Sequence, residues 1–268
     1  MPLVDAHCHA SPLWFEPVEA LLFQMDRTGV EKAVLTQLLG QFDNSYQAEC
    51  VARFPGRFAS VGAVGPADPD VVAKLRDLAK HGMRGLRLRP DARSPGDDPL
   101  AVWRVAAELG LVISCGGPTA QILGADFRTL VEELDRLPIV LEHLAGWTRP
   151  DCDRRKECWQ GILDLARFPN VHLKIPALGQ LVSRPVGKPL PKAPPILDPA
   201  GGALLLEALD VFGADRLMWG SDFPVVSSRE GYANALFWTR DLFAGRPSSD
   251  VDAIFGGNAE RIFFAAAT

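Results

Sequence analysis

The feature that most constrains the fold is a regular alternation of short apolar segments with amphipathic segments along the 268 residues. Each apolar segment has the length of a buried strand, and the segment that follows carries apolar residues at helical spacing. The predicted strands span residues 3–9, 32–39, 58–64, 83–89, 111–115, 139–144, 171–175 and 217–220. The predicted helices span residues 16–26, 46–54, 70–81, 100–109, 127–137, 158–168 and 204–212, with further helices from residue 232 onward.

Strands that alternate with helices pair in parallel through right-handed crossovers, and eight such units can close on themselves. We therefore predict an α/β fold, a (β/α)8 TIM barrel, as a single domain over residues 1–268. An open doubly wound sheet is the alternative. It is disfavoured because no glycine-rich turn follows the first predicted strand, as a dinucleotide site would require.

Composition and charge limit the classes of ligand and partner that we expect this chain to bind. Hydrophobic residues make up 47% of the chain, enough for a large core, and the net charge is −5 without a dense Lys/Arg stretch. We therefore expect a small-molecule ligand and neither nucleic acid nor a membrane as partner, and leave the oligomeric state open. With no basic leader and no apolar run of about 18 residues, we expect a cytoplasmic protein. Five cysteines without a CxxC pair indicate reduced thiols.

The first predicted strand carries two histidines. Alternation along an extended strand places Asp5, His7 and His9 on one face, so the two imidazoles point the same way. In a barrel, residues at the carboxyl ends of strands gather around one pocket, where His143 and Asp222 also end predicted strands. Three imidazoles and a carboxylate can form a mononuclear metal site or a metal-free acid/base site.

These residues lie in motifs that follow one another along most of the chain. The motifs are Asp-Ala-His-Cys-His at 5–9, Gly-Leu-Arg at 85–87, Glu-His-Leu-Ala-Gly at 142–146, Lys174, Trp-Gly-Ser-Asp-Phe-Pro at 219–224 and Gly-Asn-Ala at 257–259. Together they resemble the amidohydrolase superfamily, of the amidohydrolase-2 type. The similar branch is that of TIM-barrel metal-dependent hydrolases, which includes 2-pyrone-4,6-dicarboxylate lactonase and sugar lactonases.

Two departures from the superfamily pattern refine the predicted function. Members with two metals use a lysine on the fourth strand, where this chain has Arg87 and Arg89, so a binuclear site is not expected. Related decarboxylases carry a metal-binding histidine at the end of the fifth strand, where this chain reads Ser-Cys-Gly-Gly-Pro at 114–118. The resemblance therefore implies a hydrolase that opens a lactone. A mononuclear metal-dependent decarboxylase and a cyclic-amide hydrolase are the alternatives, and a barrel that only binds a ligand is disfavoured.

The resemblance also suggests roles for the candidate residues. Asp222 would be the general base, and His7, His9 and His143 would polarise the lactone carbonyl, with or without one divalent metal. Zinc is the expected metal, held by His7, His9 and Asp222 with His143 as a further possible ligand, although a metal-independent enzyme is equally compatible. The substrate-binding candidates are Arg87, Arg89 and Lys174, whose positive charges imply an anionic substrate.

Other roles remain open for several of these residues. Asp222 could cap the turn that follows it, and His143 could be a structural interior histidine. Either arginine could pair with an interior carboxylate such as Asp5 or Glu142.

The segment 176–202 contains seven prolines and is long for an ordinary connection, so we expect a lid or wall of the site. Arg184 or Lys188 within it could close over the ligand.

Overall fold

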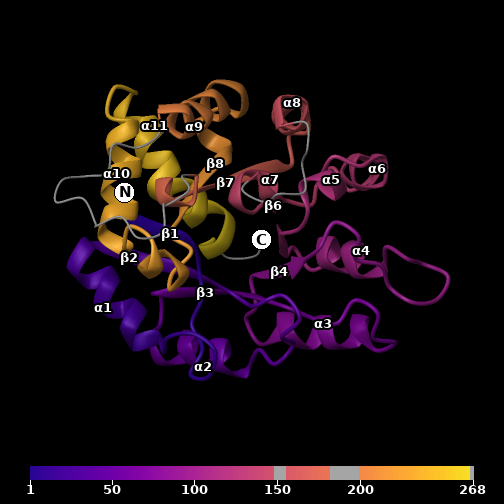
Figure 1. Ribbon diagram of the computed structural model, residues 1–268. Helices are drawn as coiled ribbons and strands as arrows, with labels where there is room; N and C mark the ends of the chain where they lie inside the picture. The colour runs from indigo at the N-terminus through magenta and orange to yellow at the C-terminus, as the bar shows by residue number, and fades with distance from the viewer. Residues whose placement is uncertain (148–154, 182–198, 266–268) are drawn as a thin grey trace.

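The structure is a computed structural model that describes residues 1–147, 155–181 and 199–265. Its eight strands form one parallel sheet in the order β1 to β8, with the helices arranged around it (Figure 1). The strands are β1 (Leu3–Cys8), β2 (Val30–Thr36), β3 (Phe58–Gly62), β4 (Gly85–Leu88), β5 (Val112–Cys115), β6 (Ile139–Leu141), β7 (Val171–Pro176) and β8 (Leu217–Gly220). This confirms the predicted (β/α)8 barrel.

The helices follow the strands in turn, and most predicted boundaries agree within a few residues. The helices are α1 (Val18–Thr28), α2 (Ser45–Arg53), α3 (Val71–Lys80), α4 (Ala101–Glu108), α5 (Thr119–Ile122), α6 (Ala125–Glu133), α7 (His143–Gly146), α8 (Arg155–Leu163), α9 (Pro199–Phe212), α10 (Tyr232–Leu242) and α11 (Ser248–Asp252). The short α5 and α7 were not predicted. Each follows a strand on the side where the loops gather, so they help to shape the site.

The barrel closes where β8 meets β1. Asp222 N donates to His7 O at 2.8 Å, and His9 N donates to Phe223 O at 2.8 Å. Gly220 permits this approach, because a Cβ at that position would lie 2.6 Å from the Cβ of His7. Closure therefore brings the two sequence-distant motifs, residues 5–9 and 219–224, side by side.

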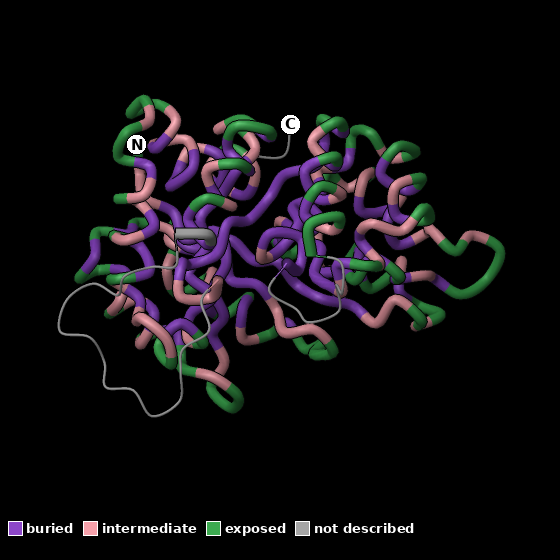
Figure 2. The backbone as a smooth tube through the Cα atoms, turned by 45° about the horizontal axis from the view of Figure 1, so that its top comes forward, coloured by how far each residue is buried: buried purple, intermediate pink, exposed green. Residues whose placement is uncertain are grey.

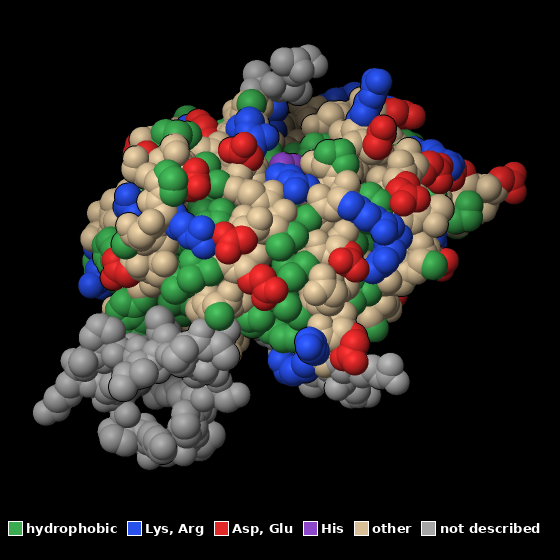
Figure 3. All heavy atoms as spheres, turned by 90° about the horizontal axis from the view of Figure 1, so that it is seen from above, with side chains coloured by type: hydrophobic (Ala, Val, Ile, Leu, Met, Phe, Trp, Pro, Cys, Tyr) green, Lys and Arg blue, Asp and Glu red, His purple; other side chains and the backbone are tan. Residues whose placement is uncertain are grey.

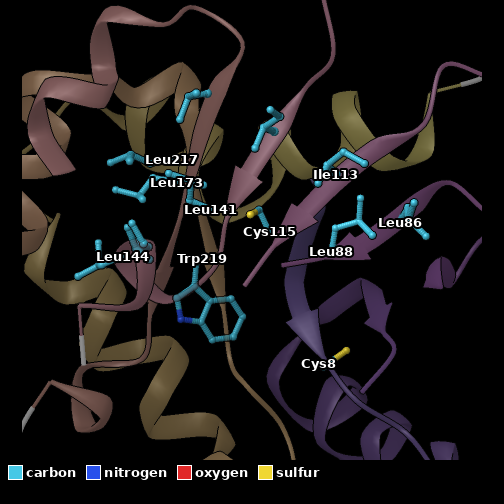
Figure 4. Close-up of a cluster of buried hydrophobic side chains, with 14 of the residues drawn as sticks. Cys8, Leu86, Leu88, Ile113, Cys115, Leu141, Leu144, Leu173, Leu217 and Trp219 are labelled. Carbon is cyan, nitrogen blue, oxygen red and sulfur yellow. The ribbon is translucent and has the colours of Figure 1, made fainter. Parts of the chain in front are cut away.

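Apolar side chains form two layers, one outside and one inside the ring of strands. The outer layer packs the strands against the helices, and Figure 4 shows part of it, including Leu86, Ile113, Leu173 and Trp219. The inner cluster contains Val34, Val61, Val112, Val140 and Met218 and is closed by Phe263 of the C-terminal segment. Figure 2 shows the buried strands at the centre and the exposed residues on the surrounding helices. Because the interior is filled in this way, the chemistry is confined to the loop end of the barrel.

One expectation for the first strand is wrong. The register of β1 against β2 shifts between Leu3 and Val4 and again between Asp5 and Cys8, so strict alternation breaks down. Ala6 joins the inner apolar cluster, whereas the carboxylate of Asp5 accepts hydrogen bonds from Ser221 and from the hydroxyl of Tyr232. These hydrogen bonds link β1 to the residues after β8. The side chain of Asp5 therefore does not share a face with that of His7.

Cys8, Cys50 and Cys115 are free and buried, as expected, but Cys158 is disulfide-bonded, so the prediction of reduced thiols is wrong for that residue.

Within the described ranges, we find no helix with the length and apolar character that a bilayer crossing requires. Figure 3 shows basic and acidic side chains intermixed on the face seen from above.

Candidate functional site

Two histidines of β1 and one carboxylate after β8 meet at the loop end of the barrel. Nε2 of His9 lies 3.5 Å from Oδ1 of Asp222, and Nε2 of His7 lies 3.9 Å from the same oxygen. The two imidazole rings are edge to face, with centroids 4.9 Å apart. All three residues are buried, so their interactions are only weakly screened by water.

The hydrogen bond of His9 fixes which of its nitrogens carries the proton. Nδ1 lies 2.6 Å from the carbonyl oxygen of Thr36, and because a carbonyl can only accept, Nδ1 must donate. In the neutral ring, Nε2 then presents a lone pair toward the Asp222 carboxylate. Two lone-pair atoms 3.5 Å apart need a proton or a cation between them. This arrangement, with a backbone carbonyl behind the imidazole, is typical of metal-binding histidines.

His7 is held from behind by Lys174 on β7. The Lys174 ammonium lies 3.1 Å from Nδ1 of His7 and donates to Oγ of Ser114 at 2.9 Å. When the ammonium donates to Nδ1, the His7 proton resides on Nε2, which is buried and has no hydrogen-bond partner among the residues that the structure describes. When Lys174 is neutral, Nδ1 can donate and Nε2 offers a lone pair. His7 can therefore serve either as a hydrogen-bond donor or as a metal ligand.

A buried charge network supports this lysine. Ser114 donates to Oε1 of Glu142 at 2.7 Å, and Arg87 donates to the same carboxylate through Nε at 2.9 Å and Nη2 at 2.6 Å. Burial raises the pKa of Glu142, but Arg87 and Lys174 outweigh this effect and hold the pKa well below its usual range. Burial lowers the pKa of Lys174 to about 8. The network thus places two cations, Arg87 and Lys174, around one carboxylate, Glu142, beneath the histidines.

His143 approaches from the far side of His7. Their ring centroids lie 4.7 Å apart, and the backbone of His143, Leu144 and Ala145 has φ values of 50°, 52° and 56°. Left-handed backbone is costly for residues with a Cβ, so its persistence here requires support from the surroundings. That support includes the hydroxyl of Thr119, which donates to Ala145 O at 3.0 Å. The left-handed turn aims the His143 ring at the site.

Burial keeps two of these imidazoles neutral. It lowers the pKa of His7 well below the usual range, and the charge of Lys174 adds to that effect. Burial also lowers the pKa of His143, although Asp222 and Glu142 oppose the shift. Burial raises the pKa of Asp222, but the neighbouring His9, His143 and Arg229 side chains outweigh burial and lower it. At neutral pH the imidazoles of His7 and His143 are therefore neutral and lie near an ionised Asp222.

The three predicted substrate-binding cations do not lie together. Arg87 is buried, and its guanidinium is occupied by Glu142 and by the carbonyl of Gln37, so pairing with an interior carboxylate is what the structure shows. Arg89 lies on the rim, exposed, where it contacts Asp91 and Gln121. Lys174 lies beneath His7. Arg184 and Lys188, and most of the predicted lid, lie outside the described residues.

Sequence reasoning missed Arg229 and the supporting roles of Thr36 and Ser114. Nη1 of Arg229 lies 3.5 Å from Oδ2 of Asp222, the carboxylate oxygen that the histidines do not use. Arg229 sits in a loop without periodicity, seven residues after Asp222, so only its proximity to the Ser-Asp-Phe-Pro motif could have drawn attention to it.

Two groups of side chains among the described residues could hold a metal ion. One consists of His7, His9 and Asp222 and the other of His7, Glu142 and His143, and within each group the potential ligand atoms lie within 4.8 Å of one another. The first group fits a divalent cation better, because Nε2 of His7 has no hydrogen-bond partner within the described ranges and Nε2 of His9 faces Asp222. Glu142 is already occupied by Arg87 and Ser114. The donor set of two imidazoles and one carboxylate suits zinc.

Comparison with known proteins shows where this architecture occurs. A family model described as Amidohydrolase matches residues 4–265. The L-fucono-1,5-lactonase of Burkholderia ambifaria is 30% identical over 247 residues, which cover 87% of this chain and 80% of that protein.

Two solved structures share the fold over nearly the whole chain. One is a proposed 2-pyrone-4,6-dicarboxylic acid hydrolase from Pseudomonas putida, with 23% identity, a TM-score of 0.73, and coverage of 98% of this chain and 97% of that one. The other is an amidohydrolase from Burkholderia multivorans with bound zinc, with 19% identity, a TM-score of 0.77, and coverage of 99% of this chain and 100% of that one.

Proposed function

The chain belongs to the amidohydrolase family and is a hydrolase, and from that premise we propose that it opens the ring of a small lactone. Family membership confirms the resemblance drawn from the sequence motifs. The observation that carries the proposal is the convergence of one carboxylate, Asp222, with the three imidazoles of His7, His9 and His143 at the loop end of the barrel. This set supplies a base and electrophilic groups for attack of water on a carbonyl.

Asp222 acts as the general base in this proposal. Its carboxylate takes a proton from the attacking water as the oxygen bonds to the lactone carbonyl carbon. When the tetrahedral intermediate collapses, the ring carbon–oxygen bond breaks, and Asp222 returns the proton to the leaving alkoxide. The product is an open-chain hydroxy acid, which ionises at neutral pH and releases one proton to the solvent.

The histidines stabilise the negative charge that develops on the carbonyl oxygen. His7 is suited to this role because its Nε2 is buried and, in the part of the chain that the structure describes, has no hydrogen-bond partner. A substrate oxygen would therefore displace no acceptor in that part of the chain. The Lys174 ammonium behind Nδ1 favours the form in which Nε2 carries the proton and can donate. His143 lies beside His7 and would contribute from the far side.

A single divalent cation fits the same place. His7, His9 and Asp222 would hold it, with His143 close enough to contribute, and zinc is the ion we propose. When bound, the cation would supply Lewis acidity to the lactone carbonyl. The positions of Asp222 and Lys174 are compatible with both the metal-bound and the metal-free enzyme, so the metal requirement must be measured.

Two findings support lactone opening over the alternative reactions. The relative that is 30% identical over most of its length is a lactonase. The end of β5, where the resemblance implies a metal-binding histidine in a decarboxylase, reads Ser-Cys-Gly-Gly-Pro at 114–118 here. Its Ser114 contacts Lys174 and Glu142. Arg89 on the rim would bind the negative charge of an anionic substrate, because the guanidinium of Arg87 is already paired with Glu142.

The test is proton release from a panel of lactones that includes sugar lactones and pyrone dicarboxylates, with wild type and Asp222→Asn. We expect turnover of at least one class by wild type and a loss of about 10²–10⁴-fold in kcat in the variant, the usual contribution of a general base. Thermal unfolding of both proteins serves as the folding control. Full activity of a folded Asp222→Asn variant would refute the role of Asp222 as base.

The same panel, run with and without a chelator, separates the two forms of the site. Turnover that survives chelation supports direct action of the histidines on the substrate. Turnover that is lost with the chelator and restored by zinc supports the metal set of His7, His9 and Asp222. Silence of the wild type on every lactone, together with turnover of a cyclic amide or an aromatic acid, would overturn the proposal.

A further inference from the structure

Asp222 has a second set of neighbours on the side away from the histidines. Its Oδ1 faces His9 and His7, whereas its Oδ2 lies 3.5 Å from Nη1 of Arg229. Arg229 follows the short helical turn η4 (Val225–Ser228) in the loop after β8, and its side chain is 19% exposed. The two carboxylate oxygens therefore have different environments: Oδ1 faces the imidazoles, and Oδ2 faces the guanidinium of Arg229.

Arg229 is in turn paired with Glu230. Nε of Arg229 lies 3.6 Å from Oε2 of Glu230, whose side chain is only 3% exposed. A buried carboxylate is costly unless it is compensated, and Arg229 is one of the groups that compensate it. Another is the backbone N–H of Gly179, which donates to Oε1 of Glu230 at 2.9 Å.

Gly179 lies in the short turn η2 (Leu178–Gln180), directly after β7. Glu230 thus links the loop after β8 to the loop after β7. A Cβ at residue 179 would lie 1.9 Å from Oε2 of Glu230, so the approach of the carboxylate requires glycine there. Gly179→Ala should therefore displace the Glu230 carboxylate without altering any charge.

Resting on the proposed function, we propose that Arg229 and Glu230 are a positioning pair for the general base. Glu230 is anchored to Gly179 and holds Arg229, and Arg229 holds the Asp222 carboxylate with Oδ1 toward the imidazoles. In that orientation the lone pair of Oδ2 that does not face Arg229 receives the proton of water. Arg229 and Glu230 act through Asp222 and need not touch the substrate.

If Arg229 and Glu230 position Asp222, replacing either residue should change kcat more than KM. Misplacement of a reacting group by about 1 Å can cost on the order of 100-fold in rate, so we expect Arg229→Met to lower kcat by about 10–100-fold. KM should stay within about threefold, because substrate contacts are retained. Arg229→Lys keeps the positive charge and should recover part of kcat. Gly179→Ala and Glu230→Gln should reduce kcat in the same direction by smaller factors.

The matched control is Arg76→Met, which removes an arginine from an ion pair with Glu108 on the outer helices, far from Asp222 in the barrel. Its kcat should equal that of wild type. A folded Arg229→Met variant with kcat within twofold of wild type would overturn the positioning role, while the lactonase assignment would stand. A KM that rises tenfold at constant kcat would also overturn it, because it would make Arg229 a substrate-binding residue.

A second measurement does not depend on finding the substrate. Crystal structures of wild type and Arg229→Met should differ in the orientation of the Asp222 carboxylate, with Oδ1 turned away from His9 in the variant. An unchanged carboxylate would overturn the inference even if no lactone were turned over. Failure of the proposed function shows instead as a wild-type enzyme that is silent on the panel.

Discussion

The buried ion pair between Arg87 and Glu142 gives the most demanding test of the structure. Nη2 of Arg87 lies 2.6 Å from Oε2 of Glu142, with side chains only 9% and 2% exposed. Arg87→Met removes the cation that donates directly to the carboxylate and leaves the carboxylate buried, with Ser114 and the more distant charge of Lys174 as its remaining partners. Breaking a buried pair from one side costs about 3–5 kcal/mol, because the remaining charge has lost its direct partner.

The chain contains a matched pair on the surface. Nη2 of Arg76 lies 2.6 Å from Oε2 of Glu108, the same separation, but these side chains are 45% and 57% exposed. Exposed pairs contribute about 0–1 kcal/mol, so Arg76→Met should change the free energy of unfolding by no more than that. Urea titrations of both variants measure the difference directly. Equal losses for Arg87→Met and Arg76→Met would refute the reasoning.

Two further measurements follow from the same pair. Adding Glu142→Gln to Arg87→Met should cost less than the sum of the single losses, because the two side chains interact directly and the double variant removes both charges of the pair. In addition, the depressed pKa of Glu142 contributes stability at pH values above the unfolded value near 4.5, and this stability is lost as the pH falls below it. In Arg87→Met, the loss of stability between pH 5 and lower pH should therefore be shallower than in wild type.

Two predictions concern residues at opposite ends of the barrel. At the rim, Arg89→Met should raise KM about tenfold for a carboxylate-bearing lactone, the effect of about 1.4 kcal/mol, and leave KM for a neutral sugar lactone unchanged. Equal effects on both substrates in steady-state assays would remove Arg89 from carboxylate binding. At the start of β7, burial lowers the pKa of His172 to about 4, so its neutral form is buried while the unfolded chain binds a proton below pH 6.5. Stability should fall as the pH drops from 6.5 to 4, by at most about 1.4 kcal/mol per pH unit, and His172→Gln should flatten that slope in urea titrations; an unchanged slope would contradict the assignment.

The sequence allowed the barrel to be predicted because each strand and helix carries its own local pattern. Buried strands such as β5 are short apolar runs, and helices such as α3 show apolar residues at helical spacing that end near a glycine. The convergence of His7, His9, His143 and Asp222 followed from one topological rule, since the carboxyl ends of barrel strands share one face. That inference required only the order of the strands.

Features that depend on side-chain packing could not be predicted in the same way. The irregular register of β1 turns Asp5 toward Ser221 and Tyr232, and alternation alone contains no signal for such a shift. Arg87 and Glu142 lie 55 residues apart, and only the closed barrel shows that the arginine is already occupied. Arg229 reaches Asp222 through an irregular loop whose conformation has no periodic signature.

The charges inside the barrel explain why the same histidines suit two kinds of chemistry. Arg87 and Glu142 form an ion pair and neutralise each other. The Lys174 ammonium contacts Ser114 and His7 and lies over the ring of Phe263, and all three charged side chains are buried. Burial and the nearby cation disfavour a protonated His7, which keeps its imidazole neutral at physiological pH. A neutral imidazole with a free Nε2 can donate to an oxyanion or accept a metal, depending on which partner holds the proton at Nδ1. The proton at the contact between Lys174 and His7 therefore sets whether Nε2 of His7 is a donor or a lone-pair ligand, and retention or loss of turnover in chelator reports which form is catalytic.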